Sequence, residues 1–226
     1  MSTVRVLLFG ADGRMGKAVA AAVAEDAGLM ITAGLDRGDP LAPAIGNCDV
    51  VIDFSAADAT EAVCQVCVEH RKPLILGTTG HGAAQKDSVV AAAQKIPLVF
   101  AANFSVGVNV LFALTRRAAE LLGEDFDLDV IEMHHRTKKD APSGTAKRLL
   151  EILQEVRGGC EIAAQSIRAG DIVGEHTVIF AGAGERLELT HRAASRETFA
   201  VGALRAARWA IGRPASLYNM EDVLGL

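Results

Sequence analysis

Near its start the chain reads Arg5-Val-Leu-Leu-Phe-Gly-Ala-Asp-Gly-Arg-Met-Gly16, an apolar run that passes into three regularly spaced glycines. The apolar run predicts a buried strand, and the Ala/Val-rich segment 14–25 predicts a helix. Glycines permit a tight turn and close approach of the backbone to a phosphate, while a helix N-terminus attracts anions. This context predicts a dinucleotide-binding loop rather than a plain turn, formed by Gly10, Ala11, Asp12, Gly13, Arg14 and Met15.

The rest of the first half repeats this strand–helix alternation. Further strands are expected at 30–35, 49–54, 73–76 and 97–100, with helices at 58–69 and 83–94. Continuous apolar strands of this kind are buried on both faces, so helices must cover both sides of a parallel sheet. Residues 1–105 are therefore expected to form a Rossmann-type α/β domain.

Polar or glycine-rich loops follow three of these strands. Asp36 ends the second strand, where a carboxylate takes ribose hydroxyls, and the adjacent Arg37 suits a 2′-phosphate, so both NADH and NADPH stay open as cofactors. Each loop alone is compatible with an ordinary turn. Because ligands bind at the carboxyl edge of such sheets, two more loops are expected to border the cofactor. Their residues are Gly77, Thr78, Thr79, Ala101, Ala102, Asn103 and Phe104.

The pattern changes after residue 105. A helix at 106–122 and another at 144–156 accompany strands at 128–133, 162–167, 176–180 and 186–190. The last strand alternates apolar and polar residues, as expected for a sheet with one open face. Residues 106–195 are therefore expected to form a smaller α+β domain with an open mixed sheet, before a closing helix at 195–211.

The chemically richest segment is 132–146, Glu-Met-His-His-Arg-Thr-Lys-Lys-Asp-Ala-Pro-Ser-Gly-Thr-Ala. His134 and His135 lie next to each other on a strand, so they should face opposite sides and are not expected to share a metal. A histidine near its ordinary pKa is a suitable proton donor. Lys138 and Lys139 add positive charge, and the helix start at 142–145 offers N–H groups to a carboxylate. Taken singly, these features are also those of an edge histidine, a solvated lysine pair and a helix cap.

Composition excludes several classes of protein. The net charge of −5 argues against nucleic-acid binding, and no apolar run is long enough to span a bilayer. No secretory signal is visible, and four cysteines form no disulfide framework, so reduced thiols in a cytoplasmic protein are expected. Cys64 and Cys67 lie within a helical pattern and are interpreted as packing residues.

In these segments the sequence resembles the 4-hydroxy-tetrahydrodipicolinate reductase (dihydrodipicolinate reductase) family. The resemblance runs from residue 4 to about 224 and includes the glycine loop, 77–79, 101–104, 132–146, 168–176 and 195–199. It implies an NADH- or NADPH-dependent oxidoreductase of diaminopimelate and lysine biosynthesis. In that reaction hydride passes to C4 of the dihydropyridine dicarboxylate, and a proton completes reduction to tetrahydrodipicolinate.

The resemblance also assigns roles to residues. It makes His134 the proton donor and Lys138 a second acid. It places the cofactor against residues 10–15, 36–37, 77–79 and 101–104, with Arg196 as a further contact. Substrate carboxylates would contact His135, Ser143, Gly144 and Thr145. It further implies a homotetramer joined through the sheets of the second domain, and a C-terminal segment, 196–226, that returns to the first.

Three departures from the family pattern stand out. The stretches 36–49 and 158–168 are shorter than in many relatives, and Thr137 stands where a histidine is common. The short stretches affect adenosine-side and tetramer contacts, and Thr137 affects substrate binding. Two alternatives remain: a related aspartate- or homoserine-type dehydrogenase, and a dinucleotide sensor that lacks the chemistry. The intact residues His134, Lys138 and 143–145 argue against the sensor.

Overall fold

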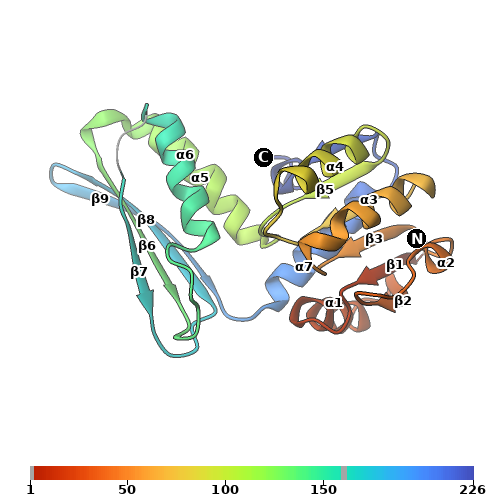
Figure 1. The fold of residues 1–226 in the computed structure, drawn as a ribbon. Helices are drawn as coiled ribbons and strands as arrows, with labels where there is room; N and C mark the ends of the chain where they lie inside the picture. Colours follow the sequence, from red (N-terminus) through yellow and green to blue (C-terminus); the bar gives the residue numbers. More distant parts are fainter. Residues whose placement is uncertain (1–2, 159–161) are drawn as a thin grey trace. The chain divides into compact units, whose positions relative to one another are not determined.

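The computed structural model describes residues 3–158 and 162–226. The chain divides into two compact units. The first comprises the residues up to Ser105 together with Glu197–Gly225, and the second comprises Val106–Arg196 with Leu226 (Figure 1). The chain therefore leaves the first unit after Ser105 and re-enters it at Glu197.

The first unit is built on a parallel sheet of six strands in the order β10-β5-β4-β3-β1-β2. The strands are β1 (Val4–Phe9), β2 (Leu29–Leu35), β3 (Val50–Asp53), β4 (Leu74–Leu76), β5 (Pro97–Phe100) and β10 (Ser216–Tyr218). β1 pairs with β2 on one side and with β3 on the other. The strand order thus reverses beside β1, and ligands of such sheets bind at this switch point.

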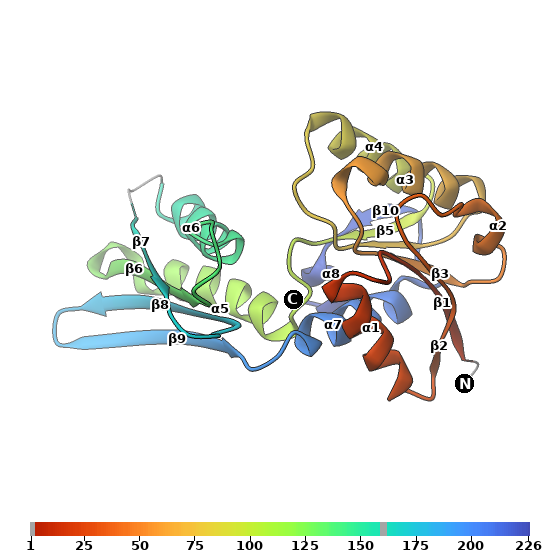
Figure 2. The same ribbon diagram turned by 60° about the horizontal axis from the view of Figure 1, so that its bottom comes forward.

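Helices cover both faces of this sheet (Figures 1 and 2). One core layer lies beneath α1 (Arg14–Ala24), α7 (Glu197–Ala210) and α8 (Met220–Leu224). The other lies beneath α2 (Ala42–Ile45), α3 (Thr60–Glu69) and α4 (Ala83–Ala93). A short 3-10 turn, η1 (Ala57–Ala59), precedes α3. Burial from both sides explains why β4 is entirely apolar and why β1 and β3 are apolar except for Arg5 and Asp53.

The second unit is a mixed sheet of four strands, in the order β7-β6-β8-β9. Its strands are β6 (Asp127–His134), β7 (Ala164–Arg168), β8 (Gly174–Gly182) and β9 (Glu185–Ala193). β6 runs parallel to β7 and antiparallel to β8. The helices α5 (Val106–Leu122) and α6 (Gly144–Val156) pack on one face, and η2 (Gly123–Asp125) follows α5. On the opposite face Ile167 remains 45% exposed.

The expected fold class is confirmed: a Rossmann-type parallel sheet and a smaller domain with an open mixed sheet. The bounds of α5, α6 and β5 are those expected, whereas α2, β10 and α8 were not predicted. Cys64 and Cys67 are buried free thiols in α3, as interpreted, and Cys160 lies outside the described residues. Across 3–158 and 162–226, no helix is both long and apolar enough to cross a membrane.

Candidate active site

The glycine loop lies at the switch point of the parallel sheet. Gly10 follows β1 with φ +87°, in the left-handed region that favours glycine. A Cβ here would lie 2.7 Å from the carbonyl of Phe54, in the loop after β3. A Cβ on Gly16 would lie 2.1 Å from the carbonyl oxygen of Gly10, so α1 packs directly on the loop. These glycines are required by the backbone geometry of a dinucleotide-type turn.

The N-terminus of α1 fits a pyrophosphate. Its N-cap residue, Gly13, provides no side-chain hydrogen bond to the first turn, and Arg14 and Met15 open the helix. The terminal N–H groups and the positive end of the helix dipole therefore suit an anion. Ala11 and Asp12 complete the loop, and the N–H of Asp12 donates to the Asp36 carboxylate over 2.9 Å.

Asp36 and Arg37 follow β2 at the same sheet edge. One carboxylate oxygen of Asp36 holds the glycine loop through Asp12. Arg37 forms an ion pair with Asp58, a residue of the turn that precedes α3. The two side chains that bear on cofactor choice therefore have different partners.

The loops after β4 and β5 also lie at this edge. Thr78 is buried and donates to Asp53 over 3.4 Å, and burial raises the pKa of Asp53 at the end of β3. Phe104 is buried against Phe54, with ring centroids 5.8 Å apart, so its side chain belongs to the core. The remaining predicted residues of these loops are Gly77, Thr79, Ala101, Ala102 and Asn103.

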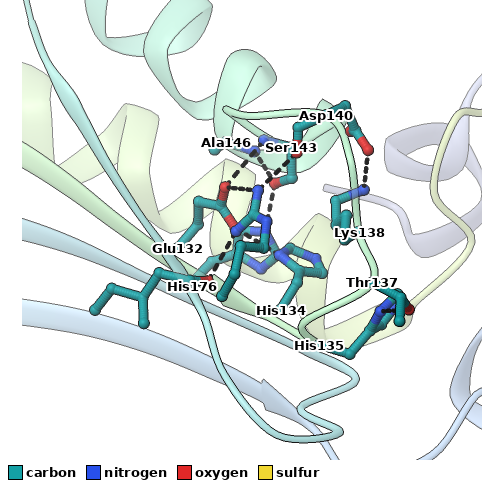
Figure 3. Close-up of polar contacts among 11 residues, drawn as sticks. Glu132, His134, His135, Thr137, Lys138, Asp140, Ser143, Ala146 and His176 are labelled. Atoms are coloured by element: carbon teal, nitrogen blue, oxygen red, sulfur yellow. Dashed lines mark hydrogen bonds and ion pairs between the residues drawn. The ribbon is translucent and has the colours of Figure 1, made fainter.

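The second unit places the histidine loop at the end of β6. Glu132 and His134 share one face of this strand, and Nδ1 of His134 lies 2.5 Å from Oε2 of Glu132 (Figure 3). Glu132 is fully buried and also accepts two hydrogen bonds from Arg168, over 2.9 and 2.7 Å. Burial opposes ionisation of Glu132, but hydrogen bonds from Arg168, Ser166 and His134 lower its pKa to about 2. A carboxylate and a guanidinium thus lie directly behind the histidine.

The expectation of a histidine near its ordinary pKa is wrong. Burial lowers the pKa of His134, the Glu132 carboxylate raises it, and the charges of Lys138 and Arg168 lower it further. The net shift is downward. The cause is tertiary burial, since only 11% of the His134 side chain is exposed.

His135 and Lys138 occupy the loop that follows. His135 is partly exposed, and its Nδ1 lies 2.8 Å from the hydroxyl of Thr137, the residue that stands where relatives often carry histidine (Figure 3). The ammonium of Lys138 pairs with Asp140 over 2.9 Å. The two adjacent histidines therefore have different surroundings, although β6 ends at His134 and His135 does not lie on the strand as expected.

The helix start at 143–145 is tied to this cluster. Ser143 is the N-cap of α6 and accepts from the N–H of Ala146 over 3.2 Å, and its hydroxyl lies 3.0 Å from Nε2 of His176. Its own N–H donates to Glu132 over 3.3 Å. The positive end of α6, at Gly144 and Thr145, therefore lies beside the Glu132–His134 pair. Arg196 is the residue directly before α7.

Sequence reasoning assigned no role to Glu132, Arg168 or His176. A signal for Glu132 was present, because residues two apart on a strand share a face with each other. Arg168 pairs with His134 across β6–β7, and His176 pairs with Glu132 across β6–β8. Those registers require the folded sheet. Among the described residues, no group of three or more His, Cys, Asp or Glu side chains is arranged to hold a metal ion.

Comparisons with known proteins identify the family of the chain. Models of the dihydrodipicolinate reductase N-terminus and C-terminus match residues 4–104 and 107–224. The chain is 49% identical to the 4-hydroxy-tetrahydrodipicolinate reductase of Akkermansia muciniphila, over 99% of this chain and 98% of that protein. It is 45% identical to the enzyme of the same name from an Anaeromyxobacter species, over 99% and 98% of the two chains.

A solved structure shares the fold. Dipicolinate-bound dihydrodipicolinate reductase from Paenisporosarcina sp. TG-14 superposes with a TM-score of 0.82 at 23% identity, over 96% of this chain and 97% of that one. Fold, glycine loop and relatives together define an NAD(P)H-dependent oxidoreductase with a Rossmann-type domain. Within that class, the chain belongs to the dihydrodipicolinate reductase family. This excludes the aspartate- or homoserine-type dehydrogenase as its family.

Proposed function

We propose that this chain reduces 4-hydroxy-tetrahydrodipicolinate to tetrahydrodipicolinate, a step of diaminopimelate and lysine biosynthesis, with NADH or NADPH. The observation that carries the proposal is the cluster at the end of β6. There a buried histidine, a lysine and a helix N-terminus meet in one loop, in a chain of this family. A sensor of dinucleotides has no use for such a cluster.

The substrate is proposed to bind through its two carboxylates. The cationic Lys138, the imidazole of His135 and the N-terminus of α6 at Gly144 and Thr145 all attract carboxylate oxygens. Ser143 contributes by holding that helix start in place, since its hydroxyl contacts Ala146 and His176 within the protein. The site thus recognises a small dianion by charge and by helix-end N–H groups.

The cofactor is proposed to bind at the carboxyl edge of the parallel sheet. Residues 10–15 would hold the pyrophosphate, Asp36 and Arg37 the adenosine ribose, and 77–79 and 101–104 the nicotinamide side, with Arg196 as a further contact. The close-packed glycines and the uncapped start of α1 fit this group. The reduced nicotinamide supplies the hydride when bound.

His134 or Lys138 is proposed to supply the proton that completes the reduction. Both are held by carboxylates, His134 by Glu132 and Lys138 by Asp140. An arriving dianion favours the protonated form of a nearby imidazole, which offsets the effect of burial on His134. The same positive charges stabilise the negative charge that develops on the ring.

The assembly is proposed to be a homotetramer in the cytoplasm, joined through the open face of the second sheet. That face carries the partly exposed Ile167 beside Met133, while both helices of the unit pack on the other face. Exposed apolar side chains on an uncovered sheet are suited to association with another copy.

A coupled assay tests the function. The substrate is generated from pyruvate and aspartate semialdehyde by the preceding synthase, and oxidation of NADH or NADPH is followed by absorbance. We expect turnover that falls by about 100-fold or more in His134→Gln and in Lys138→Ala. Dinucleotide binding without turnover would refute the reductase assignment.

A further inference from the structure

The Glu132 carboxylate is a fully enclosed charge of the second unit. It has no exposed surface, yet it accepts hydrogen bonds from Arg168 through both oxygens, and from the N–H of Ser143. Arg168 in turn donates over 2.7 Å to the carbonyl of Asp140, within the loop that carries Lys138. A buried charge is costly unless it is paired in this way, which makes its placement behind His134 informative.

This arrangement determines the tautomer of His134. An ionised carboxylate only accepts hydrogen bonds, so the Nδ1 atom 2.5 Å from Glu132 must carry a hydrogen. In the neutral ring, Nε2 is then the nitrogen with a lone pair, and the nitrogen that takes up and releases a proton.

Nε2 of His134 has space beside it at Gly174. Gly174, the first residue of β8, lies against it, and a Cβ at that position would lie 3.0 Å from Nε2 and 3.4 Å from Cδ2. Glycine therefore leaves room on the side of the ring where the reacting nitrogen lies. Any larger residue would crowd that nitrogen.

We propose that Glu132 is a positioning residue that holds His134 as the Nδ1–H tautomer, so that Nε2 delivers the proton past Gly174. The inference rests on the proposed function and specifies the proton donor of that reaction. In the step, the Nε2–H bond breaks and its electrons remain on the ring nitrogen. The proton joins the electron pair that hydride addition leaves on the substrate, and the neutral ring keeps its Nδ1–H.

The charged groups around His134 set its pH dependence. Glu132 on β6, Arg168 on β7, His176 on β8 and Lys138 in the loop all face it. Glu132 is the anion of this set, so its removal leaves only groups that disfavour the imidazolium. The protonated form is the active one in this step, so the rate declines as pH rises. In Glu132→Gln that decline should move to lower pH.

Kinetics of matched variants provide the first test. Glu132→Gln keeps the shape of the side chain and an oxygen acceptor but removes the charge, and Gly174→Ala crowds Nε2 while leaving the Glu132–Arg168 pair intact. The controls are Glu155→Gln, an exposed ion-paired carboxylate of α6, and Gly46→Ala, which has open space around it. We expect kcat to fall about 100-fold in Glu132→Gln and about 10-fold in Gly174→Ala, with KM nearly constant and both controls active. A pH profile of Glu132→Gln that superposes on the unmodified enzyme would overturn the proposal.

A spectroscopic test is independent of turnover. In the ligand-free enzyme with 15N-labelled histidine, the ring nitrogens report which one carries hydrogen, and His134→Gln assigns the signals. We expect Nδ1–H at His134 in the unmodified protein and in Gly174→Ala, and a mixture of tautomers in Glu132→Gln. An Nε2–H tautomer in the unmodified protein would refute the positioning role even if the enzyme is active. If Glu132→Gln fails to fold, Gly174→Ala decides: unchanged kcat contradicts the proposal. Absence of turnover in the unmodified enzyme would instead refute the proposed function.

Discussion

The guanidinium of Arg37 lies 2.5 Å from the carboxylate of Asp58, while its neighbour Asp36 accepts a hydrogen bond from the glycine loop. Arg37 is the residue suited to a 2′-phosphate, and Asp36 is suited to ribose hydroxyls. Asp36 therefore contacts the glycine loop, and Arg37 is held by Asp58. We therefore predict that the Arg37–Asp58 pair weakens binding of a 2′-phosphate, so that NADH is used more readily than NADPH.

Asp58→Asn should release Arg37 and remove a negative charge near it. Because the pair is exposed, its contribution is small, so we expect kcat/KM for NADPH to rise roughly 2- to 5-fold. The kcat/KM of Asp58→Asn for NADH should equal that of Asp87→Asn, a control variant in α4. Equal changes for both cofactors, measured side by side, would show that this ion pair does not influence the choice.

Gly202→Ala should destabilise the first unit. A Cβ on Gly202, in α7, would lie 1.8 Å from the carbonyl oxygen of Phe104, a backbone atom that cannot easily move. We expect a loss of about 3 kcal/mol in the free energy of unfolding. Urea titration monitored by the fluorescence of Trp209, the one tryptophan of the chain, measures it. Gly46→Ala serves as control, and equal stability of the two variants would contradict the close packing.

Acid should weaken the second unit before the first. Burial lowers the pKa of His176 from 6.5 to about 4, so its neutral form stabilises the fold above pH 6.5, and this stability is lost as pH falls toward 4. The difference corresponds to about 3 kcal/mol. Glu132, whose pKa falls from 4.5 to about 2, extends the loss below pH 4.5.

Two optical probes separate the units, because Trp209 and Tyr218 both belong to the first. Far-ultraviolet circular dichroism should show loss of folded structure at a higher pH than tryptophan fluorescence does. In His176→Gln, the free energy of unfolding should change less with pH between 6.5 and 4. The variant His70→Gln, at an exposed position, should retain the pH dependence of the unmodified protein. If the free energy of unfolding of His176→Gln depended on pH as in the unmodified protein, the loss could not be attributed to His176.

Cys64 and Cys67 should be inert in the folded protein. Burial raises the pKa of Cys64 to about 11 and that of Cys67 well above its usual value, so neither forms the reactive thiolate at neutral pH. Peptide mass mapping after iodoacetamide treatment should find both unmodified in native buffer and both modified in urea. Modification of the native protein at the rate of an exposed thiol would contradict their packing role.

Much of the fold could be read from the sequence because its signals are local. Local apolar patterns predicted the strand–glycine loop–helix unit at 5–25 and the helices at 106–122 and 144–156. In the folded protein, these elements pack as the patterns indicate. β10 has only three residues and no such pattern, and it forms because it pairs with β5. Tertiary pairing of this kind leaves no local signal.

The site divides in the same way. The shared face of Glu132 and His134 was available from the alternation of a strand, but the contact with Arg168 depends on the register of β6 and β7. The lowered pKa of His134 depends on burial beneath the loop, which periodicity does not reveal. Similarly, the Arg37–Asp58 pair joins residues 21 positions apart.

Isotope transfer tests whether hydride passes from a nicotinamide to the dicarboxylate substrate. The enzyme is supplied with substrate made in situ by the synthase and with NADH deuterated at the transferring position of C4. Mass spectrometry of the tetrahydrodipicolinate formed is the measurement. We expect product heavier by one deuterium, and unlabelled product from unlabelled cofactor. Product without label from the deuterated cofactor, or no product with either NADH or NADPH, would contradict it.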